Sequence, residues 1–138
     1  MEITLNNFQK KVFLPRKKIK KLVQKVLKGE AVKKTGRINF CFVDQALMIK
    51  LNRRFLKTKS ATDVLAFDLS DKKNPQIILA DIIISTPAAL KQAVKFKTSP
   101  HYEIFLYLVH GLLHILGFND QTHLQINQMR KKESQYVD

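Results

Sequence analysis

The chain of 138 residues contains one cysteine, Cys41, which excludes an internal disulfide. It does not open with the successive basic, apolar and small-residue regions of a signal peptide, and no uncharged apolar stretch reaches the roughly 18 residues that a membrane span needs. We therefore expect a cytoplasmic protein in a reducing environment, without a membrane partner. Internal repeats, low-complexity segments and linkers are also lacking, so we expect a single domain over residues 1–138 that buries a core without disulfides or a structural metal.

Acidic residues are scarce in the first part of the chain. Residues 1–60 contain 17 lysines and arginines but only 3 aspartates and glutamates, whereas residues 61–138 contain 8 of each kind. The net charge of +14 therefore arises entirely from the first 60 residues. A basic field this one-sided attracts polyanions, so nucleic acid is the natural partner and an anionic membrane surface is the weaker alternative. The simpler interpretation is that these lysines only solvate the surface.

Hydrophobic periodicity predicts strands that alternate with helices. The predicted strands cover residues 2–5, 37–43, 63–69 and 76–85. The predicted helices cover residues 15–29, 44–55, 86–95, 100–116 and 121–138. The last strand is apolar enough to be buried on both faces, and Thr86 and Ser99 are expected to cap the helices that follow them. This order predicts an α+β fold, a single domain with a mixed four-stranded sheet packed against helices.

The predicted helix over residues 15–29 has one apolar and one basic face. Its basic face carries six lysines: Lys17, Lys18, Lys20, Lys21, Lys25 and Lys28. These side chains form one continuous positive surface, which suits a polyanion but is also typical of a solvated helix face.

The predicted helix over residues 100–116 is apolar almost all round, so it is expected to be the buried central helix. His110 and His114 are set into it four residues apart, which places both imidazoles on one face, close enough to share a tetrahedral metal. Burying two imidazoles costs on the order of a few kcal/mol unless their nitrogens find partners, and one metal supplies both partners. A core histidine with one hydrogen bond is the simpler interpretation, but two at this spacing favour a metal site.

Gly117 is expected to end this helix in the left-handed conformation. The chain then turns, and two candidate third ligands follow, Asp120 and His123. Gly111 occupies the position at which a zinc protease of the H-E-x-x-H kind has its general base, so peptide hydrolysis by that route is not expected. A metal with three protein ligands and an open position still acidifies a bound water and polarises a phosphoryl oxygen, as phosphodiester cleavage requires.

Three segments carry a family resemblance: residues 110–118 read H-G-L-L-H-I-L-G-F, residues 62–67 read T-D-V-L-A-F and residues 80–85 read A-D-I-I-I-S. They resemble the YbeY family, bacterial endoribonucleases of ribosomal RNA maturation. The first segment resembles the family signature H-G-x-L-H-x-x-G-[YF]-x-H. The second resembles its P-T-[DN]-V-L-S-F strand, and the third resembles its G-D-[IL]-V-I-[SC] strand. Leu51 and Asn52 fit its helix before the first of these strands. The resemblance implies a zinc-binding fold with a cleft beside the histidine helix, and a role at the 3′ end of small-subunit ribosomal RNA and in ribosome quality control.

The sequence departs from the family pattern at two positions. The family's third histidine falls without a gap on Asp120, so the resemblance assigns the third ligand position to Asp120, with His123 as the alternative. An aspartate ligand would make the bound water less acidic and the set compatible with iron or other divalent metals. The simpler interpretation is that Asp120 only caps the last helix. The second departure is Leu56, which stands where the family pattern has an arginine.

Because of Leu56, a catalytic arginine cannot be carried over from the family. The nearby candidates for binding RNA phosphate are Arg53, Arg54, Lys57 and Lys59, with surface charge as the simpler interpretation. A further carboxylate interrupts the last apolar strand. This residue, Asp81, is a candidate for contact with the metal ligands or with a partner, and a structural hydrogen bond is the alternative.

The leading prediction is a metal-dependent, single-strand-specific endoribonuclease in which a metal held by His110, His114 and Asp120 activates water. Zinc is the expected cofactor, at one ion per chain. The expected partners are ribosomal RNA, the small ribosomal subunit and a ribosomal protein. The alternative is a non-catalytic or weakly catalytic RNA-binding ribosome-assembly factor, in which the metal serves structure and Leu56 marks lost catalysis.

Overall fold

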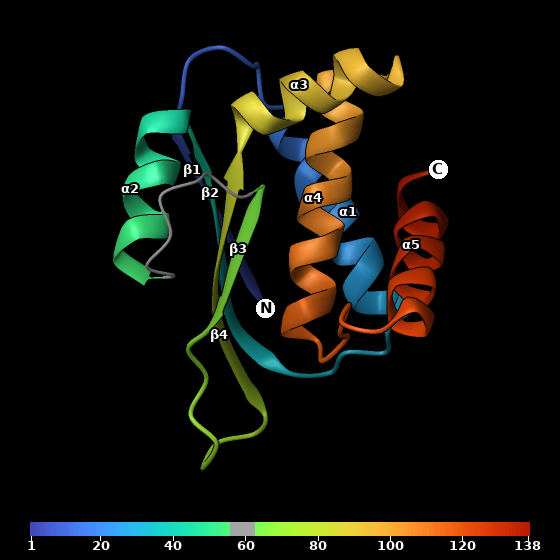
Figure 1. Ribbon diagram of the computed structural model, residues 1–138. Helices are drawn as coiled ribbons and strands as arrows, with labels where there is room; N and C mark the ends of the chain where they lie inside the picture. The colour runs from blue at the N-terminus through green and yellow to red at the C-terminus, as the bar shows by residue number, and fades with distance from the viewer. Residues whose placement is uncertain (56–62) are drawn as a thin grey trace.

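The computed structural model in Figure 1 describes residues 1–55 and 63–138. Within these residues, one sheet contains four strands: β1 (Glu2–Phe8), β2 (Thr35–Val43), β3 (Val64–Asp68) and β4 (Ile77–Ser85). The same residues contain five helices: α1 (Arg16–Gly29), α2 (Gln45–Phe55), α3 (Thr86–Phe96), α4 (Pro100–Ile115) and α5 (His123–Val137). In this described part of the chain, every helix is too short or too polar to cross a membrane.

The sheet is mixed and has the strand order β1-β2-β4-β3. β1 pairs with β2 and β2 pairs with β4 in parallel, whereas β3 runs antiparallel to β4, with Val64 opposite Ile84. The start of β3 therefore lies beside the end of β4, at one edge of the sheet. The predicted α+β fold with a mixed four-stranded sheet is confirmed.

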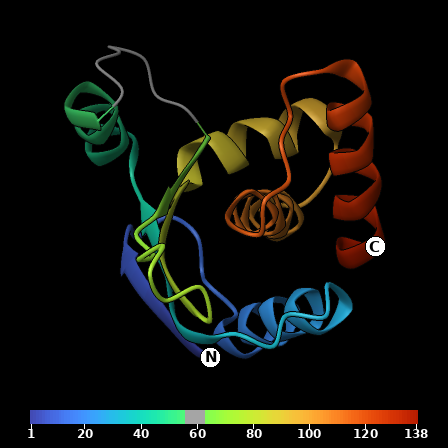
Figure 2. The same cartoon turned by 90° about the horizontal axis from the view of Figure 1, so that it is seen from below.

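α4 lies in the middle of the helical layer. Seen close to its axis, it is surrounded by the sheet, α1, α3 and α5 (Figure 2). Its side chains Ile104, Leu108 and Leu112 are fully buried and share one core with Ile82 and Ile84 of β4. An apolar surface this broad is stable only when neighbours cover it from several sides, which fixes α4 firmly against the sheet. The predicted buried central helix is confirmed.

α2 covers the opposite face of the sheet through a smaller core of Val43, Met48, Leu65 and Ile83. The expectation that β4 is buried on both faces is correct only near the end of the strand. Earlier in β4 the side chain of Leu79 is 42% exposed. The reason is that α2 packs around Ile83 and leaves the preceding part of that face uncovered.

The helix boundaries agree with the predicted ones to within about two residues, but one cap differs. α3 begins after Ser85, whose hydroxyl accepts a hydrogen bond from the amide of Ala88, so Thr86 is the first helical residue and not the N-cap. Ser99 caps α4 as predicted and accepts a hydrogen bond from the amide of Tyr102. Each cap satisfies an amide that the first helical turn leaves without a partner in the helix.

Candidate metal centre

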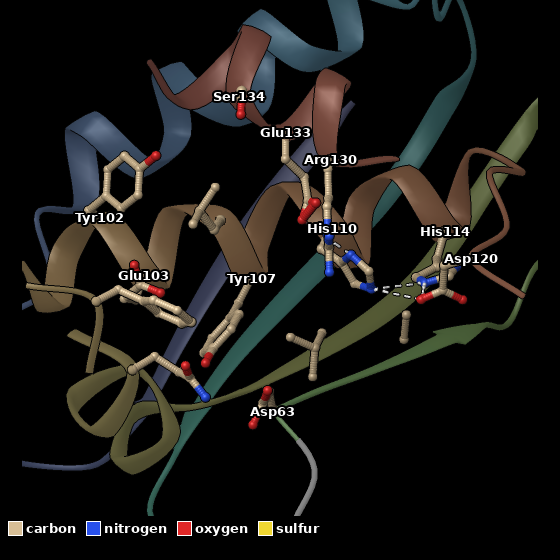
Figure 3. A pocket seen from close by; sticks show the side chains of 15 residues that line it. Asp63, Tyr102, Glu103, Tyr107, His110, His114, Asp120, Arg130, Glu133 and Ser134 are labelled. Carbon is tan, nitrogen blue, oxygen red and sulfur yellow. Dashed lines mark hydrogen bonds and ion pairs between the residues drawn. The ribbon is translucent and has the colours of Figure 1, made fainter. Parts of the chain in front are cut away.

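His110 and His114 lie one turn apart on the face of α4 that borders a cleft (Figure 3). Their side chains are 28% and 29% exposed, whereas the neighbouring Val109 and Leu113 are fully buried. The Nε2 atoms of the two imidazoles are 3.0 Å apart. The helical spacing therefore brings two nitrogen donors together at a surface that solvent and substrate can reach.

Gly111 faces the sheet and not the cleft. A β-carbon at this position would lie 2.7 Å from Cγ2 of Ile82 and 3.1 Å from Cγ1 of Val64. Real side chains do not tolerate the first of these contacts, so the absence of a side chain lets α4 approach β3 and β4 this closely. A glutamate at position 111 would point into the sheet and clash there. This position therefore has no room for the general base of an H-E-x-x-H protease.

The turn after α4 returns the chain to the histidines. Gly117 has a φ of 104°, in the left-handed region predicted for it. The amides of Gly117 and Phe118 donate hydrogen bonds to the carbonyl oxygens of His114 and Leu113, which is the Schellman pattern of a helix end. This reversal places the carboxylate of Asp120 beside the imidazoles.

Asp120 completes a triangle of three donor atoms. Its Oδ2 lies 3.4 Å from Nε2 of His110 and 3.3 Å from Nε2 of His114. Ligand atoms held about 2.0–2.1 Å from a tetrahedral zinc ion are about 3.3–3.4 Å apart, because the edge of a tetrahedron is about 1.6 times its centre-to-corner distance. The three edges of 3.0, 3.3 and 3.4 Å match one face of such a tetrahedron. These three residues can therefore hold one metal ion.

Glu133 of α5 contacts the far side of the His110 ring. Its Oε1 lies 3.4 Å from Nδ1 of His110, and its side chain is only 15% exposed. Burial alone would lower the pKa of His110, but the hydrogen bond and charge of Glu133, with Asp120 and Asp63, raise it above the ordinary value. A carboxylate at Nδ1 keeps the proton on that nitrogen and leaves the lone pair of Nε2 available to a metal.

Sequence reasoning did not identify Glu133 as part of the site. The available signal is its position one turn after Met129, which is a buried residue of α5. Residues four apart share a helix face, so Glu133 is directed toward the core side of α5, where α4 lies. That spacing indicates an inward-facing carboxylate, but it does not identify the histidine that the carboxylate contacts.

The donor triangle forms part of the wall of a cleft of about 840 Å³ between α3, α4, α5 and the residues at the start of β3 (Figure 3). The described residues that line the cleft include four carboxylates, those of Asp63, Glu103, Asp120 and Glu133, against one permanent cation, Arg130. This part of the wall repels phosphate oxygens except close to Arg130 or to a bound metal ion. The charge that binds a polyanion must therefore lie mainly outside this part of the cleft.

Tyr107 has a buried hydroxyl in the wall of the cleft, without a hydrogen-bond partner among residues 1–55 and 63–138. Burial, together with the charges of Asp63 and Glu103, raises the pKa of this hydroxyl, so it stays protonated at neutral pH. Glu103 is itself buried, and it accepts a hydrogen bond of 2.8 Å from Oγ1 of Thr98. Tyr107 therefore presents a proton donor that the described protein groups leave unused.

The alternative third ligand, His123, is the first residue of α5 and is exposed. Within the described residues, the group of donors close enough to share a metal comprises His110, His114 and Asp120, without His123. The N-cap of α5 is Thr122, whose hydroxyl accepts a hydrogen bond from the amide of Gln125. The interpretation of Asp120 as the cap of the last helix is therefore wrong.

Arg53 and Arg54 lie in the last turn of α2 and are exposed. α2 is on the opposite side of the sheet from α4 (Figure 2), and neither arginine lines the cleft. The other predicted positions in this region, Leu56, Lys57 and Lys59, lie outside the described residues.

The basic face of α1, formed by its six lysines, is exposed along the whole helix. The helix contains no acidic residue, and its opposite face buries Ile19, Val23, Val26 and Leu27 in the core. α1 and α3 lie on opposite sides of α4 (Figure 2), and the cleft is on the α3 side. The basic face of α1 is therefore a surface separate from the cleft.

Asp81 points to the sheet face opposite α4, since its neighbours Ala80 and Ile82 belong to the main core. Its Oδ1 accepts a hydrogen bond of 3.4 Å from Nδ2 of Asn39 on β2. Asp81 neither lines the cleft nor belongs to the donor triangle. Its position supports the interpretation of a structural hydrogen bond.

Fold and site together define a small α+β protein with a histidine and carboxylate centre in an open cleft, the type of centre that metal-dependent hydrolases use. Residues 4–138 match the family model described as Endoribonuclease YbeY. The chain belongs to the YbeY family, as its resemblance predicts.

Individual relatives agree with this assignment. The endoribonuclease YbeY of Pelotomaculum thermopropionicum is 32% identical, over 99% of this chain and 95% of its own length. That of Desulforamulus reducens is 31% identical, over 96% of this chain and 93% of its own length. A solution structure of a Thermotoga maritima protein is 21% identical and superposes with a TM-score of 0.68, over 98% of this chain and 86% of that one, which shows a shared fold.

Proposed function

We propose that the protein is a metal-dependent, single-strand-specific endoribonuclease that acts at the 3′ end of small-subunit ribosomal RNA and in ribosome quality control. The observation that carries the proposal is the donor triangle of His110, His114 and Asp120, whose edges of 3.0 to 3.4 Å fit one metal ion. Family membership supports the reaction class, since the relatives are named endoribonucleases. We place the activity of the whole domain, residues 1–138, in the cytoplasm, with ribosomal RNA, the small ribosomal subunit and a ribosomal protein as partners.

The residues of the triangle would hold one zinc ion, which when bound acidifies a water and polarises a phosphoryl oxygen. Glu133 holds the proton on Nδ1 of His110, so that Nε2 is directed at the other two donors. Asp120 adds a negative charge that a third histidine would not add, and this lowers the net positive charge of the centre. Two imidazoles and one carboxylate also suit iron or other divalent metals.

The basic face of α1 is proposed to hold the RNA backbone. Its six exposed lysines have no acidic neighbour on the helix, whereas the cleft wall carries four carboxylates. The helix of 14 residues is about 21 Å long, which is enough to contact several phosphates. Arg53 and Arg54, in the last turn of α2, remain proposed contacts with RNA phosphate, as do Lys57 and Lys59 outside the described residues.

A second candidate is a non-catalytic or weakly catalytic RNA-binding assembly factor with a structural metal. Two observations favour it. Arg130 is the only permanent cation among the described residues that line the cleft, and Leu56 stands where the family pattern has an arginine. Cleavage of a phosphodiester builds up negative charge that positioned cations stabilise in the transition state. A cleft with few cations is therefore expected to slow catalysis more than it weakens RNA binding.

The test measures metal content and RNA cleavage side by side. We expect about one zinc per chain and cleavage of single-stranded RNA in the wild type, and loss of both in His114→Ala and Asp120→Asn. His123→Gln is the matched control, because His123 lies close in sequence but outside the donor triangle, and it should retain both properties. Cleavage that survives His114→Ala and chelation would refute the proposed function. Salt-sensitive RNA binding without cleavage at any metal concentration would support the second candidate.

A further inference from the structure

The cleft extends from the metal centre toward the N-terminal end of α4. Glu103, Tyr107 and His110 follow one another at helical spacing on the same face, with Glu133 and Arg130 on one side and Asp63 on the other (Figure 3). At 1.5 Å per residue, Tyr107 is about 4–5 Å and Glu103 about 10 Å along the helix axis from His110. This length matches one to two nucleotides beside a phosphate held at the donor triangle.

Aromatic rings line this extension. Phe96, at the end of α3, and Tyr102, in the first turn of α4, belong to the same cleft wall as Tyr107. Phe96 is 59% exposed, although a large apolar ring normally gains stability from burial. The ammonium of Lys95 lies 5.3 Å from the centre of the Phe96 ring, so the ring has a positive charge beside it. An exposed ring next to a cation is the arrangement on which a nucleotide stacks its base.

The polar groups of the extension suit a base edge better than a phosphate. Tyr107 presents a protonated, buried hydroxyl without a partner among the described residues, and groups of this kind are rare in folded proteins. A ring nitrogen or carbonyl oxygen of a base can accept a hydrogen bond from such a hydroxyl. The carboxylates of Glu103 and Asp63 can accept hydrogen bonds from the amino groups of bases, whereas they repel phosphate oxygens.

We propose that this end of the cleft is a nucleobase pocket, in which the unpaired base next to the cleaved bond stacks on Phe96 and accepts a hydrogen bond from the Tyr107 hydroxyl. This inference rests on the proposed function for the identity of the ligand as RNA. It gives single-strand specificity a physical cause. A base in a duplex is paired and stacked and cannot enter the pocket, whereas an unpaired base enters without that cost.

The test is a binding experiment without metal, so that it does not depend on cleavage. The probe is a fluorescently labelled single-stranded RNA hexamer. It is compared with otherwise identical hexamers that each carry one abasic ribose, placed at a different position in each. Both kinds of oligonucleotide have the same phosphates, so their difference in affinity reports the base alone. For the wild type in EDTA, we expect the abasic residue at one position to weaken binding by about 5-fold or more.

Phe96→Ala should bind the two oligonucleotides equally. The matched control is Phe13→Ala, which removes an exposed phenylalanine outside the cleft and should keep the wild-type difference. Tyr107→Phe retains the ring and removes only the hydroxyl, so it should preserve the fold and the preference for a base but reduce discrimination between bases. Equal binding of both oligonucleotides by the wild type, or a wild-type difference in Phe96→Ala, would overturn the nucleobase pocket.

The outcomes also separate this inference from the proposed function. One outcome is that binding depends on the base, that this dependence disappears in Phe96→Ala, and that the protein cleaves no RNA with any metal. This outcome would support the nucleobase pocket and reject the endoribonuclease. Metal-dependent cleavage with the wild-type base preference intact in Phe96→Ala would support the endoribonuclease and reject the pocket.

Discussion

Glu133→Gln isolates the contribution of the carboxylate behind His110. The substitution preserves the size of the side chain and removes the charge that lies 3.4 Å from Nδ1 of His110. Loss of a carboxylate partner of a ligating histidine lowers metal affinity by about 10-fold to 100-fold, on the order of 1.4 to 2.7 kcal/mol. Because Glu133 is only 15% exposed, water and salt screen little of its charge, so we expect a loss in the upper part of this range.

The same substitution changes the pH dependence of metal binding in a defined direction. Glu133 raises the pKa of His110, so the imidazole of the wild type becomes protonated at a higher pH than that of the variant. The affinity ratio of wild type to variant should therefore be largest above the pKa of His110 and should shrink as the pH falls. In the metal-free protein, the raised pKa of His110 also contributes to the free energy of unfolding. This contribution is fully present at a pH below the ordinary histidine pKa, and it is lost as the pH rises through the raised pKa.

The assay is a zinc competition titration with a chromophoric chelator between about pH 5.5 and about pH 8, across the range in which histidines titrate. The control is Glu2→Gln, which removes a carboxylate that pairs with Arg37 at the protein surface and does not line the cleft. The control should match the wild type at every pH. Equal zinc affinities of Glu133→Gln and wild type at the upper end of the range would refute the role of Glu133. A ratio independent of pH would refute the explanation through the pKa of His110.

Three further predictions follow from the fold and its charges. Gly111→Ala should destabilise the protein by about 1–3 kcal/mol in urea unfolding, since the added methyl group overlaps the sheet; unchanged stability would contradict the close helix–sheet contact. The double variant Lys17→Gln, Lys21→Gln should weaken binding of single-stranded RNA of any sequence and reduce the salt dependence of that binding. The control is the double variant Lys72→Gln, Lys73→Gln, at exposed positions before β4, which should change neither the affinity nor its salt dependence. Zinc at about 100 times its dissociation constant should stabilise the fold by about 2.7 kcal/mol and raise the melting temperature, an effect that chelation reverses; no shift would contradict a metal bound to the folded state.

The parts of the site that the sequence predicts are those that local geometry determines. The i,i+4 spacing of His110 and His114 fixes their relation as soon as the helix forms, and Gly117 needs only its own backbone freedom to reverse the chain. Asp120 follows the turn so closely that its position depends on a few dihedral angles. Glu133 is different, because its contact with His110 depends on how α5 packs against α4, which periodicity within one helix does not specify.

The distribution of charge in the structure likewise depends on packing that the sequence pattern does not specify. The net charge of +14 predicts a polyanion partner but does not locate its contacts, and the cleft wall proves to be acidic. Sheet order and helix packing place Asp63, from before β3, and Glu133, from α5, around one space, while the lysines of α1 lie beyond the opposite side of α4. Composition is a sum over the surface, whereas this separation is a consequence of tertiary structure.

The two surfaces imply different tasks in RNA recognition. In the proposed function, lysines on the basic face of α1 contact phosphates, which are the same for every sequence, so they would set affinity and its dependence on salt. The proposed nucleobase pocket offers rings, carboxylates and a hydroxyl, which would distinguish bases and reject paired ones. If this division is correct, substitutions in α1 should change the KM of all RNA substrates by a similar factor. Substitutions of Phe96 or Tyr107 should instead change the ratio of kcat/KM between substrates that differ in one base.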